Sequence, residues 1–192
     1  MKRLAFFISG GGGNALNLLK ACREGRVPAH PVLAIASSPK AAGLAKLEAE
    51  GLKGVVLERR AFEGDAAFSE ACYAACEAEG VDLICLAGWL KKLSVPKRWE
   101  GRILNIHPAL LPAYGGPGMY GMHVHRAVVA AGEKESGATV HLVDEQYDHG
   151  RILAQARVPV LAGDTPEALQ QRVYAAEMDL YPKALADFLR GR

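Results

Sequence analysis

The sequence predicts an α/β fold: a mostly parallel, doubly wound sheet with helices on both faces. Short, continuously apolar runs such as Leu4–Ile8 and Leu83–Ala87 have the character of buried parallel strands. They alternate with amphipathic helical patterns, and this alternation builds right-handed βαβ units. The 192 residues, half of them hydrophobic, are enough for one core, and no linker interrupts them. We therefore expect a single domain over residues 1–192.

The first half of the chain begins with the strand Leu4–Ile8, which runs into the glycine loop Ser9–Asn14. A helix follows, in which Leu16, Leu19 and Arg23 recur at helical spacing. The last strand of this half opens into a loop that faces the same sheet edge as the glycine loop. The later elements expected here are strand 32–36, helix 41–50, strand 54–57, helix 65–79, strand 83–87 and loop 88–94.

The second half is arranged around a strand that stops at His107. Ile103, Leu104 and Ile106 are apolar, whereas Pro108 has no N–H to donate to a strand ladder. The elements expected after it are the glycine-rich loop 114–121, helix 123–131, strand 137–143, the acidic loop 144–150, an antiparallel edge strand over 152–160, and a long amphipathic helix from an N-cap at Thr165 to Leu189.

Strand, glycine loop and helix in that order form a phosphate-binding arrangement. Glycines let backbone N–H groups converge on an anion, and the helix N-terminus adds positive partial charge. The same loop matches the dinucleotide pattern GxGxxA through Gly10, Gly12 and Ala15. No acid follows the next strand to hold an NAD ribose, but Ser38 and Lys40 suit the 2′-phosphate of NADP. A tight turn without ligand is the third interpretation, which the entropic cost of four consecutive glycines disfavours.

Asn105 and His107 are the first candidates for catalysis. They stand two residues apart on a strand, so both side chains point to the same side, at the strand end where open α/β sheets build active sites. An amide donor beside an imidazole suits oxyanion stabilisation and proton transfer. Taken alone, the pair also fits a turn-fixing asparagine and a core histidine.

His123 and His125 form an HxH pair that invites a metal-site interpretation. No third ligand lies near them in the sequence, so we expect no metal here. At the start of a predicted helix, the two histidines are better placed to cap it and to orient the neighbouring loop.

Composition narrows the class of ligand and the compartment. The net charge is +2 and no basic run occurs, which favours a small anionic ligand over nucleic acid. The four cysteines form no CxxC pair and fall in predicted helices and a buried strand, as in a reducing compartment. The first apolar run is too short for a signal peptide, and no apolar stretch is long enough to span a membrane. We therefore expect a cytoplasmic protein.

The order of motifs along the whole chain resembles the folate-dependent phosphoribosylglycinamide (GAR) formyltransferases. The resemblance is carried by Ile8-Ser-Gly10, Gly13-Asn14, Leu86-Ala-Gly-Trp-Leu90, Asn105-Ile-His-Pro108, Leu110-Leu-Pro112, His123-x-His125, Gly137-x-Thr-x-His141, Asp148-x-Gly150, Glu177 and Tyr181-Pro182. It implies the formyltransferase fold, with a Rossmann-like, phosphate-binding half over residues 1–100 and a catalytic, folate-binding half over 101–192.

The resemblance also implies an activity and a set of site residues. The formyl group would pass from 10-formyltetrahydrofolate to the amine of GAR without a metal, in purine biosynthesis. The catalytic residues implied are Asn105, His107 and Asp148, with Asp148 favouring the protonated form of His107. Those implied for GAR are Gly12, Gly13, Asn14 and Glu177, the last near the amine. Those implied for the folate are Leu90, Lys91, Lys92, Leu93, Asn105, Asp144, Glu145, Gln146, Tyr147 and Asp148.

The sequence departs from that family at three places. Glycine stands at position 13, where relatives usually have serine, so one hydroxyl donor is missing. The arginine that often contacts the folate tail has no match, and Arg59 or Arg60 is the expected substitute. The loop 114–121 is long compared with the corresponding loop of some members of that family.

Two other functions remain as alternatives: an NADP-dependent oxidoreductase and a non-catalytic nucleotide-binding module. Within the superfamily, methionyl-tRNA formyltransferase and formyltetrahydrofolate hydrolase carry additional domains, which the length of this chain does not lead us to expect. We expect small-molecule substrates as the partners, with no nucleic acid and no membrane, and either a monomer or a homodimer.

Overall fold

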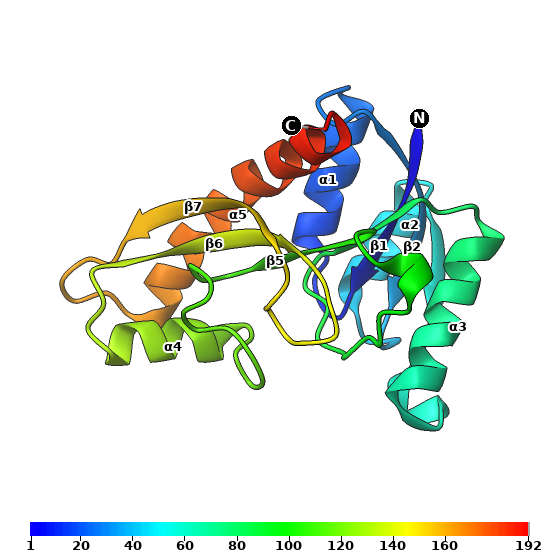
Figure 1. Cartoon of the computed structure of the whole chain (residues 1–192). Coiled ribbons are helices and arrows are strands. Elements are labelled where there is room, and N and C mark those ends of the chain that lie inside the picture. The colour runs from blue at the N-terminus through cyan, green and yellow to red at the C-terminus, as the bar shows by residue number, and fades with distance from the viewer. Residues whose placement is uncertain (192) are drawn as a thin grey trace.

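The computed structural model describes residues 1–191 and contains one seven-stranded sheet in the order β3-β2-β1-β4-β5-β6-β7 (Figure 1). The first five strands run parallel, and β6 and β7 are antiparallel additions at one edge. The strands are β1 (Lys2–Ile8), β2 (Ala29–Ala36), β3 (Lys53–Val56), β4 (Leu83–Leu86), β5 (Ile103–His107), β6 (Glu135–Leu142) and β7 (Ile152–Pro159). The predicted fold class, including the antiparallel edge strand, is confirmed.

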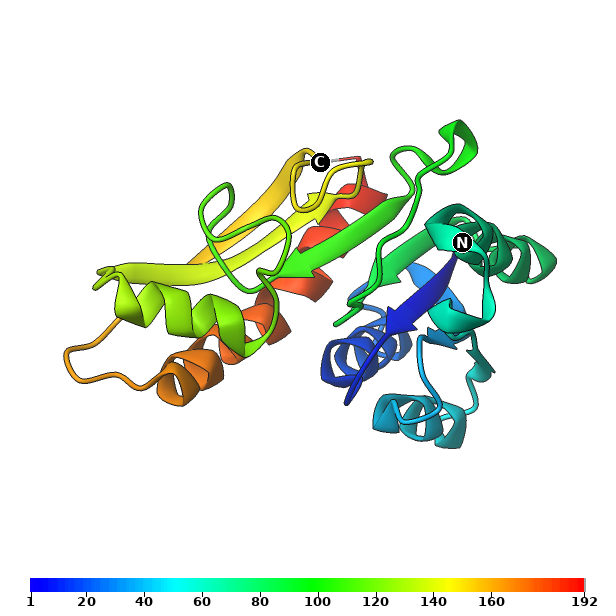
Figure 2. The ribbon, with the colours of Figure 1, turned by 90° about the horizontal axis from the view of Figure 1, so that it is seen from below.

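Helices cover both faces of the sheet. They are α1 (Gly13–Arg23), α2 (Ala42–Ala49), α3 (Gly64–Ala78), α4 (Met122–Ala130) and α5 (Pro166–Leu189), with short 3₁₀ turns at Arg59–Ala61 and Lys97–Trp99. Figures 1 and 2 show α1, α2 and α3 grouped around β1–β4, and α4 and α5 against β5–β7. One apolar cluster lies under α1, α2, α4 and α5, and a second, rich in aromatic side chains, lies under α3. None of the helices in residues 1–191 is long and apolar enough to cross a membrane.

β2 begins three residues earlier than the sequence predicts, and it includes Pro31. The register with β1 shifts at this point, since Leu4 pairs with Pro31 and Ala5 pairs with Leu33. Pairing with β3 begins only at Leu33. Pro31 therefore lies where the strand has a neighbour on one side only, and the missing N–H costs no ladder bond there.

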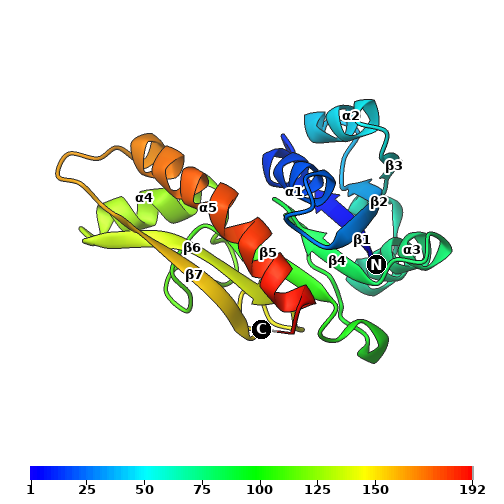
Figure 3. The ribbon, with the colours of Figure 1, turned by 90° about the horizontal axis from the view of Figure 1, so that it is seen from above.

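β1 lies at the point where the strand order reverses. From β1 the chain moves outwards to β2 and β3, and then returns to the other side of β1 as β4. The loops after β1 and β4 therefore diverge, and they leave a crevice at the carboxyl ends of these strands. Helix α5 runs from the far end of the β6–β7 pair back to α1, as Figure 3 shows, so the C-terminal helix reaches the wall of this crevice.

Candidate active site

A cavity of about 810 Å³ occupies the crevice at the carboxyl ends of β1, β4 and β5. Both predicted strand-end loops open into it, together with one face of α5. The wall is formed by residues 10–14, 86–93, 105–108, 116–121 and 143–148, with Lys46, His125, His141, Gln170, Tyr174 and Glu177. The residues that the resemblance implies for catalysis, for GAR and for the folate all line this one cavity.

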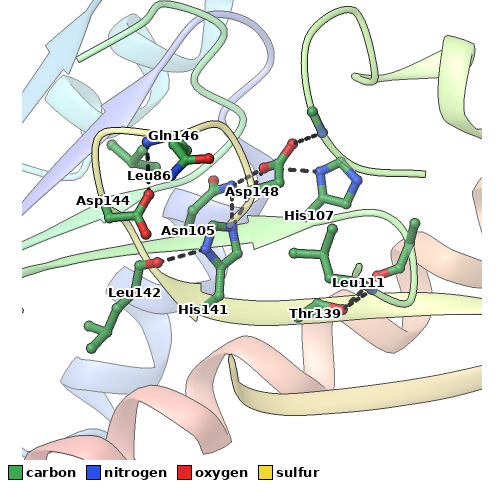
Figure 4. Close-up of polar contacts among 12 residues, drawn as sticks. Leu86, Asn105, His107, Leu111, Thr139, His141, Leu142, Asp144, Gln146 and Asp148 are labelled. Atoms are coloured by element: carbon green, nitrogen blue, oxygen red, sulfur yellow. Dashed lines mark hydrogen bonds and ion pairs between the residues drawn. The ribbon is translucent and has the colours of Figure 1, made fainter. Parts of the chain in front are cut away.

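Asn105, His107 and Asp148 meet at one carboxylate oxygen. Asp148 Oδ1 lies 3.5 Å from Asn105 Nδ2 and 3.4 Å from His107 Nδ1 (Figure 4). The other oxygen, Oδ2, accepts a hydrogen bond of 3.0 Å from the backbone N–H of Gly116. Asp148 itself has a φ of 52°, an uncommon conformation for a residue with a side chain. The loop after β6 thus brings its carboxylate to the end of β5.

His107 is buried between two acceptors. Its Nε2 lies 2.8 Å from the carbonyl oxygen of Tyr114, and a carbonyl can only accept, so Nε2 carries a hydrogen. The atom left to gain or lose a proton is Nδ1, which faces Asp148.

Burial lowers the pKa of His107, and this effect outweighs the charge of Asp148 and the Tyr114 carbonyl, which both raise it. Asp148 favours the protonated form of His107, as expected, but burial outweighs it, so the pKa lies below its ordinary value rather than being raised. The carboxylate faces Nδ1 and stabilises a proton that this atom takes up.

His141 belongs to the same cluster, although sequence reasoning gave it no role. It lies directly opposite Asn105 in the β5–β6 pairing. Its Nδ1 donates to the carbonyl of Leu142 at 2.8 Å, so in the neutral ring Nε2 accepts from Asn105 Nδ2 at 3.1 Å. His141 thereby fixes which end of the Asn105 amide faces Asp148. The strand alternation around Gly137-x-Thr-x-His141 was the only sequence signal for it.

Asp148 remains ionised. Burial alone would raise its pKa, but the imidazole of His141 at 3.6 Å, the positive charge that His107 can carry and the Gly116 N–H together lower it. The cluster therefore combines a carboxylate with two imidazoles and an amide, and the carboxylate and both imidazoles are mostly buried.

Thr139 holds the turn that follows His107. Its hydroxyl donates to the carbonyl of Ala109 at 2.6 Å and accepts from the N–H of Leu111 at 3.1 Å (Figure 4). Gln155 of β7 donates to the same hydroxyl and to the carbonyl of Leu111. The two edge strands thus fix the position at which β5 stops.

The glycine loop brings the N-terminus of α1 to the cavity. Gly12 is the N-cap, with a left-handed φ of 70°, and a Cβ added to it would lie 2.8 Å from the Cα of Gly43. Glycine is thus required at position 12 by conformation and by contact with α2. No side chain caps α1, so its first N–H groups, at Gly13 and Asn14, stay open to a ligand.

Asn14 and Glu177 join the glycine loop to α5. Asn14 Nδ2 donates to Glu177 Oε2 at 2.7 Å, and both residues are buried. Burial raises the pKa of Glu177 to about 7, with the Asn14 hydrogen bond opposing the shift. Glu177 therefore does not belong to a solvated helix face.

The two segments expected to bind the folate lie opposite each other at the other end of the cavity. Lys92 Nζ lies 5.9 Å from the centre of the Tyr147 ring, so the loops 88–93 and 144–148 meet there. The backbone N–H of Val95 donates to Glu145 Oε1 at 2.8 Å, which fixes the acidic loop to the chain after Ser94. Asp144 pairs with His149 at 2.8 Å.

The expected substitutes for the missing arginine are not at the cavity. Arg59 Nε pairs with Asp65 at 2.5 Å and its guanidinium also donates to the carbonyl of Phe62, whereas Arg60 pairs with Glu58. Both side chains pair within their own part of the chain rather than lining the cavity. The cations on the cavity wall are Lys46, Lys91 and Lys92. Ser38 and Lys40, which an NADP phosphate would need, are also absent from the wall as far as residues 1–191 define it.

The HxH pair is divided between two environments. His123 is exposed and packs edge-on against Tyr120, with ring centres 5.1 Å apart, while His125 is buried on the cavity wall. Neither histidine caps α4, because no side chain accepts from the helix N-terminus. Within the described part of the chain, no three His, Cys, Asp or Glu side chains are grouped to hold a metal ion.

Comparisons with known proteins place this chain among formyl transferases. The Formyl transferase family model matches residues 2–185. Phosphoribosylglycinamide formyltransferase of Haemophilus influenzae is 36% identical over 195 residues, which cover all of this chain and 89% of that protein. The trifunctional purine biosynthetic protein adenosine-3 of Drosophila melanogaster is 41% identical over 99% of this chain, which spans only 14% of that longer protein.

A solved structure agrees with these relatives. Glycinamide ribonucleotide transformylase 1 from Symbiobacterium toebii superposes with a TM-score of 0.94 at 39% identity, covering 100% of this chain and 89% of that one. With a family model that matches nearly the whole sequence, and a full-length bacterial relative above 30% identity, the chain belongs to the formyl transferase family, and within it to the phosphoribosylglycinamide formyltransferases.

Proposed function

We propose that this chain transfers the formyl group of 10-formyltetrahydrofolate to the amine of GAR, giving formyl-GAR and tetrahydrofolate. The observation that carries the proposal is the position of the Asn105–His107–Asp148 cluster. It lies in the middle of one cavity, between an anion-binding helix N-terminus and a pocket with apolar and amphipathic walls. A cavity of about 810 Å³ is large enough to hold two substrates end to end.

GAR occupies the end formed by α1 and α5. The N–H groups of Gly13 and Asn14 bind its phosphate together with the glycine loop at Gly12, because an uncapped helix N-terminus stabilises an anion. Glu177 lies beside Asn14 and pairs with the amine end. The Glu177 carboxylate holds the protonated amine near the cluster until the amine loses its proton.

The folate occupies the end formed by the loops after β4 and β6. Leu90 and Leu93 supply apolar surface for the pterin, and the backbone of 144–148 supplies polar partners for its edge. Lys91 and Lys92 are exposed at the rim, where the anionic tail of the folate leaves the cavity. Lys91 and Lys92 would then bind the folate tail, the role that the sequence led us to expect of Arg59 or Arg60.

The chemical step is direct transfer between the two bound substrates. The amine nitrogen of GAR attacks the formyl carbon, and a tetrahedral oxyanion forms. An N–H of Asn105 stabilises the oxyanion, because its 3.5 Å contact with Asp148 is long enough to be exchanged for a stronger one. His107 takes up a proton at Nδ1, where Asp148 stabilises the resulting charge. The C–N10 bond then breaks, and the proton lost by the amine ends on N10 of the folate.

Positioning supplies much of the rate in such a mechanism, since no covalent enzyme intermediate is needed. The partners we propose are the two small-molecule substrates, in a cytoplasmic enzyme that is a monomer or a homodimer. All four cysteines are free thiols, which fits a reducing compartment.

The proposal is tested by following the absorbance of a 10-formyl folate analogue on addition of GAR. We expect deformylation of the analogue that depends on GAR and yields one formyl-GAR per folate released. A mixture without GAR controls for hydrolysis. Folded protein that shows no GAR-dependent transfer would contradict the proposed activity.

A further inference from the structure

The hydroxyl of Tyr174 occupies the place where a side chain on residue 13 would lie. A Cβ built on Gly13 would lie 2.0 Å from Tyr174 Oη and 3.1 Å from Cζ. Gly13 is not among the residues with positive φ, so its backbone conformation is open to any residue. What fills the place of a side chain at this position is the Tyr174 hydroxyl.

The rest of the loop shows that this constraint is local. A Cβ on Gly10 or Gly11 would have nothing within 4 Å, and neither has a positive φ. Gly12 is constrained by α2 rather than by α5. Position 13 is therefore where α5 reaches into the glycine loop.

Tyr174 lies on the face of α5 that lines the cavity. Gln170 and Glu177 lie on the same face, four residues before it and three residues after it. The Tyr174 side chain is 44% exposed, although it touches the first residue of α1. Its hydroxyl thus stands at the uncapped helix N-terminus with access to the cavity.

A second observation is an incomplete set of hydrogen bonds beside the glycine loop. Asn14 is only 9% exposed, and its Oδ1 has no hydrogen-bond partner among residues 1–191. Its Nδ2 is already bonded to Glu177. Leaving a buried acceptor unpaired costs free energy, so the bond to Glu177 does not complete the pairing of Asn14 beside the glycine loop.

We propose that Tyr174 is a phosphate-binding residue, whose hydroxyl donates to the phosphate of GAR in place of the side chain that residue 13 lacks. A hydroxyl that donates to a phosphate oxygen forms a charge-assisted bond, which is stronger than one between neutral groups. The inference rests on the proposed function, because it assigns one donor within the GAR end of the same cavity.

A side chain at position 13 and the Tyr174 hydroxyl cannot share the place that the hydroxyl occupies. A side chain at 13 would displace the exposed tyrosine ring, or fit beside a smaller residue at 174. Only one of the two positions can supply the hydroxyl. The pair is therefore testable by exchanging the donor between them.

The experiment is titration calorimetry of GAR and of a 10-formyl folate analogue with three variants. Tyr174→Phe keeps the ring and removes the donor, so we expect its Kd for GAR to rise about tenfold or more, while the Kd for the folate analogue stays unchanged. Tyr174→Ala should lose the same donor. Gly13→Ser/Tyr174→Ala should recover most of the lost GAR affinity, because the serine hydroxyl replaces the phenol.

The steric part is tested by Gly13→Ser alone, with Gly10→Ser as the matched control for thermal stability. We expect the first to lower Tm and the second to leave it unchanged, since only residue 13 meets the tyrosine. The affinity of inorganic phosphate, measured by its competition with GAR, should fall in Tyr174→Phe as much as the affinity of GAR does. A parallel fall assigns the lost affinity to the phosphate end of GAR.

The outcomes separate this inference from the proposed function. If the wild-type protein does not bind GAR, both fail. If the wild type binds GAR and Tyr174→Phe binds it equally tightly, the proposed function stands and the role of Tyr174 is wrong. A double variant that binds GAR no better than Tyr174→Ala would contradict the exchange of donors.

Discussion

Asn14 and Glu177, 163 positions apart in the chain, share a buried hydrogen bond of 2.7 Å between Nδ2 and Oε2. This bond joins the first turn of α1 to the middle of α5, and therefore the two walls of the GAR end. Burial raises the pKa of the Glu177 carboxyl to about 7. A group that changes charge near neutral pH thus stands where we propose that an amine binds.

The buried carboxyl should make stability depend on pH. The folded-state pKa of Glu177, about 7, is above the ordinary value of 4.5, so the folded state binds this proton more tightly than the unfolded state. The contribution of this proton to the free energy of unfolding is fully present below the unfolded-state pKa of Glu177. It is lost as pH rises through the folded-state pKa. Glu177→Gln keeps the acceptor for Asn14 and should avoid this loss, which amounts to at most about 3 kcal/mol.

Urea unfolding at pH 5 and pH 8 measures the effect. We expect the variant to gain stability relative to the wild type on going from pH 5 to pH 8. If the free energy of unfolding changed equally in both proteins between pH 5 and pH 8, ionising Glu177 would not destabilise the fold.

The same carboxyl should control GAR binding. Glu177 pairs with the amine only when it is ionised, so the affinity of the wild type for GAR should fall as pH drops below about 7. Glu177→Gln should bind GAR more weakly at pH 8, with folate binding unchanged. The phosphate of GAR titrates in the same way with both proteins. The difference between their pH profiles of GAR affinity therefore reports the Glu177 carboxyl alone. Calorimetric profiles of identical shape would mean that Glu177 does not meet the amine.

The fold was predictable because its signals are local. The continuous apolar runs predicted β1 and β4, Ile103, Leu104 and Ile106 predicted β5, and Pro108 marked where β5 ends. The start of β2 was missed because Pro31 is tolerated only by a register shift, which depends on the neighbouring strands.

The candidate site was predictable as a set of residues, but its electrostatics were not. The pKa of His107 depends on how much burial opposes Asp148, and a sequence shows neither. The role of His141 depends on the pairing of β5 with β6. The contact of Gly13 with Tyr174 joins segments far apart in the chain, and only the fold brings them together.

His141 should affect turnover by orienting the Asn105 amide. His141→Phe keeps a ring of similar shape but removes the nitrogen that accepts from Asn105 Nδ2. The amide is then free to turn, and we expect kcat to fall about tenfold or more, with the KM for GAR nearly unchanged. His141→Gln, which can restore an acceptor, should recover part of the loss. Equal kcat values in the two variants would rule out a role in orienting the amide.

The pKa of His107 should lie below its ordinary value of 6.5. Asp148→Asn removes the charge that opposes the effect of burial, so the pKa should fall further. Titration of the imidazole carbon resonances by NMR measures both values. A higher pKa in the variant would mean that Asp148 does not stabilise the protonated ring.

The central claim is that His107 and Asp148 act as one unit in formyl transfer. Asp148→Asn should fold, bind both substrates, and lose about 10²–10³-fold in turnover, the scale seen when a group that stabilises an oxyanion is removed. His107→Asn should lose a similar factor. The two side chains lie 3.4 Å apart, so the effects should not multiply.

The most direct test is the single-turnover rate of formyl transfer in the wild type, both single variants and the double variant, with both substrates saturating. We predict that the double variant is little slower than either single variant. Losses that multiply fully in the double variant would contradict the account, because the two residues would then act independently.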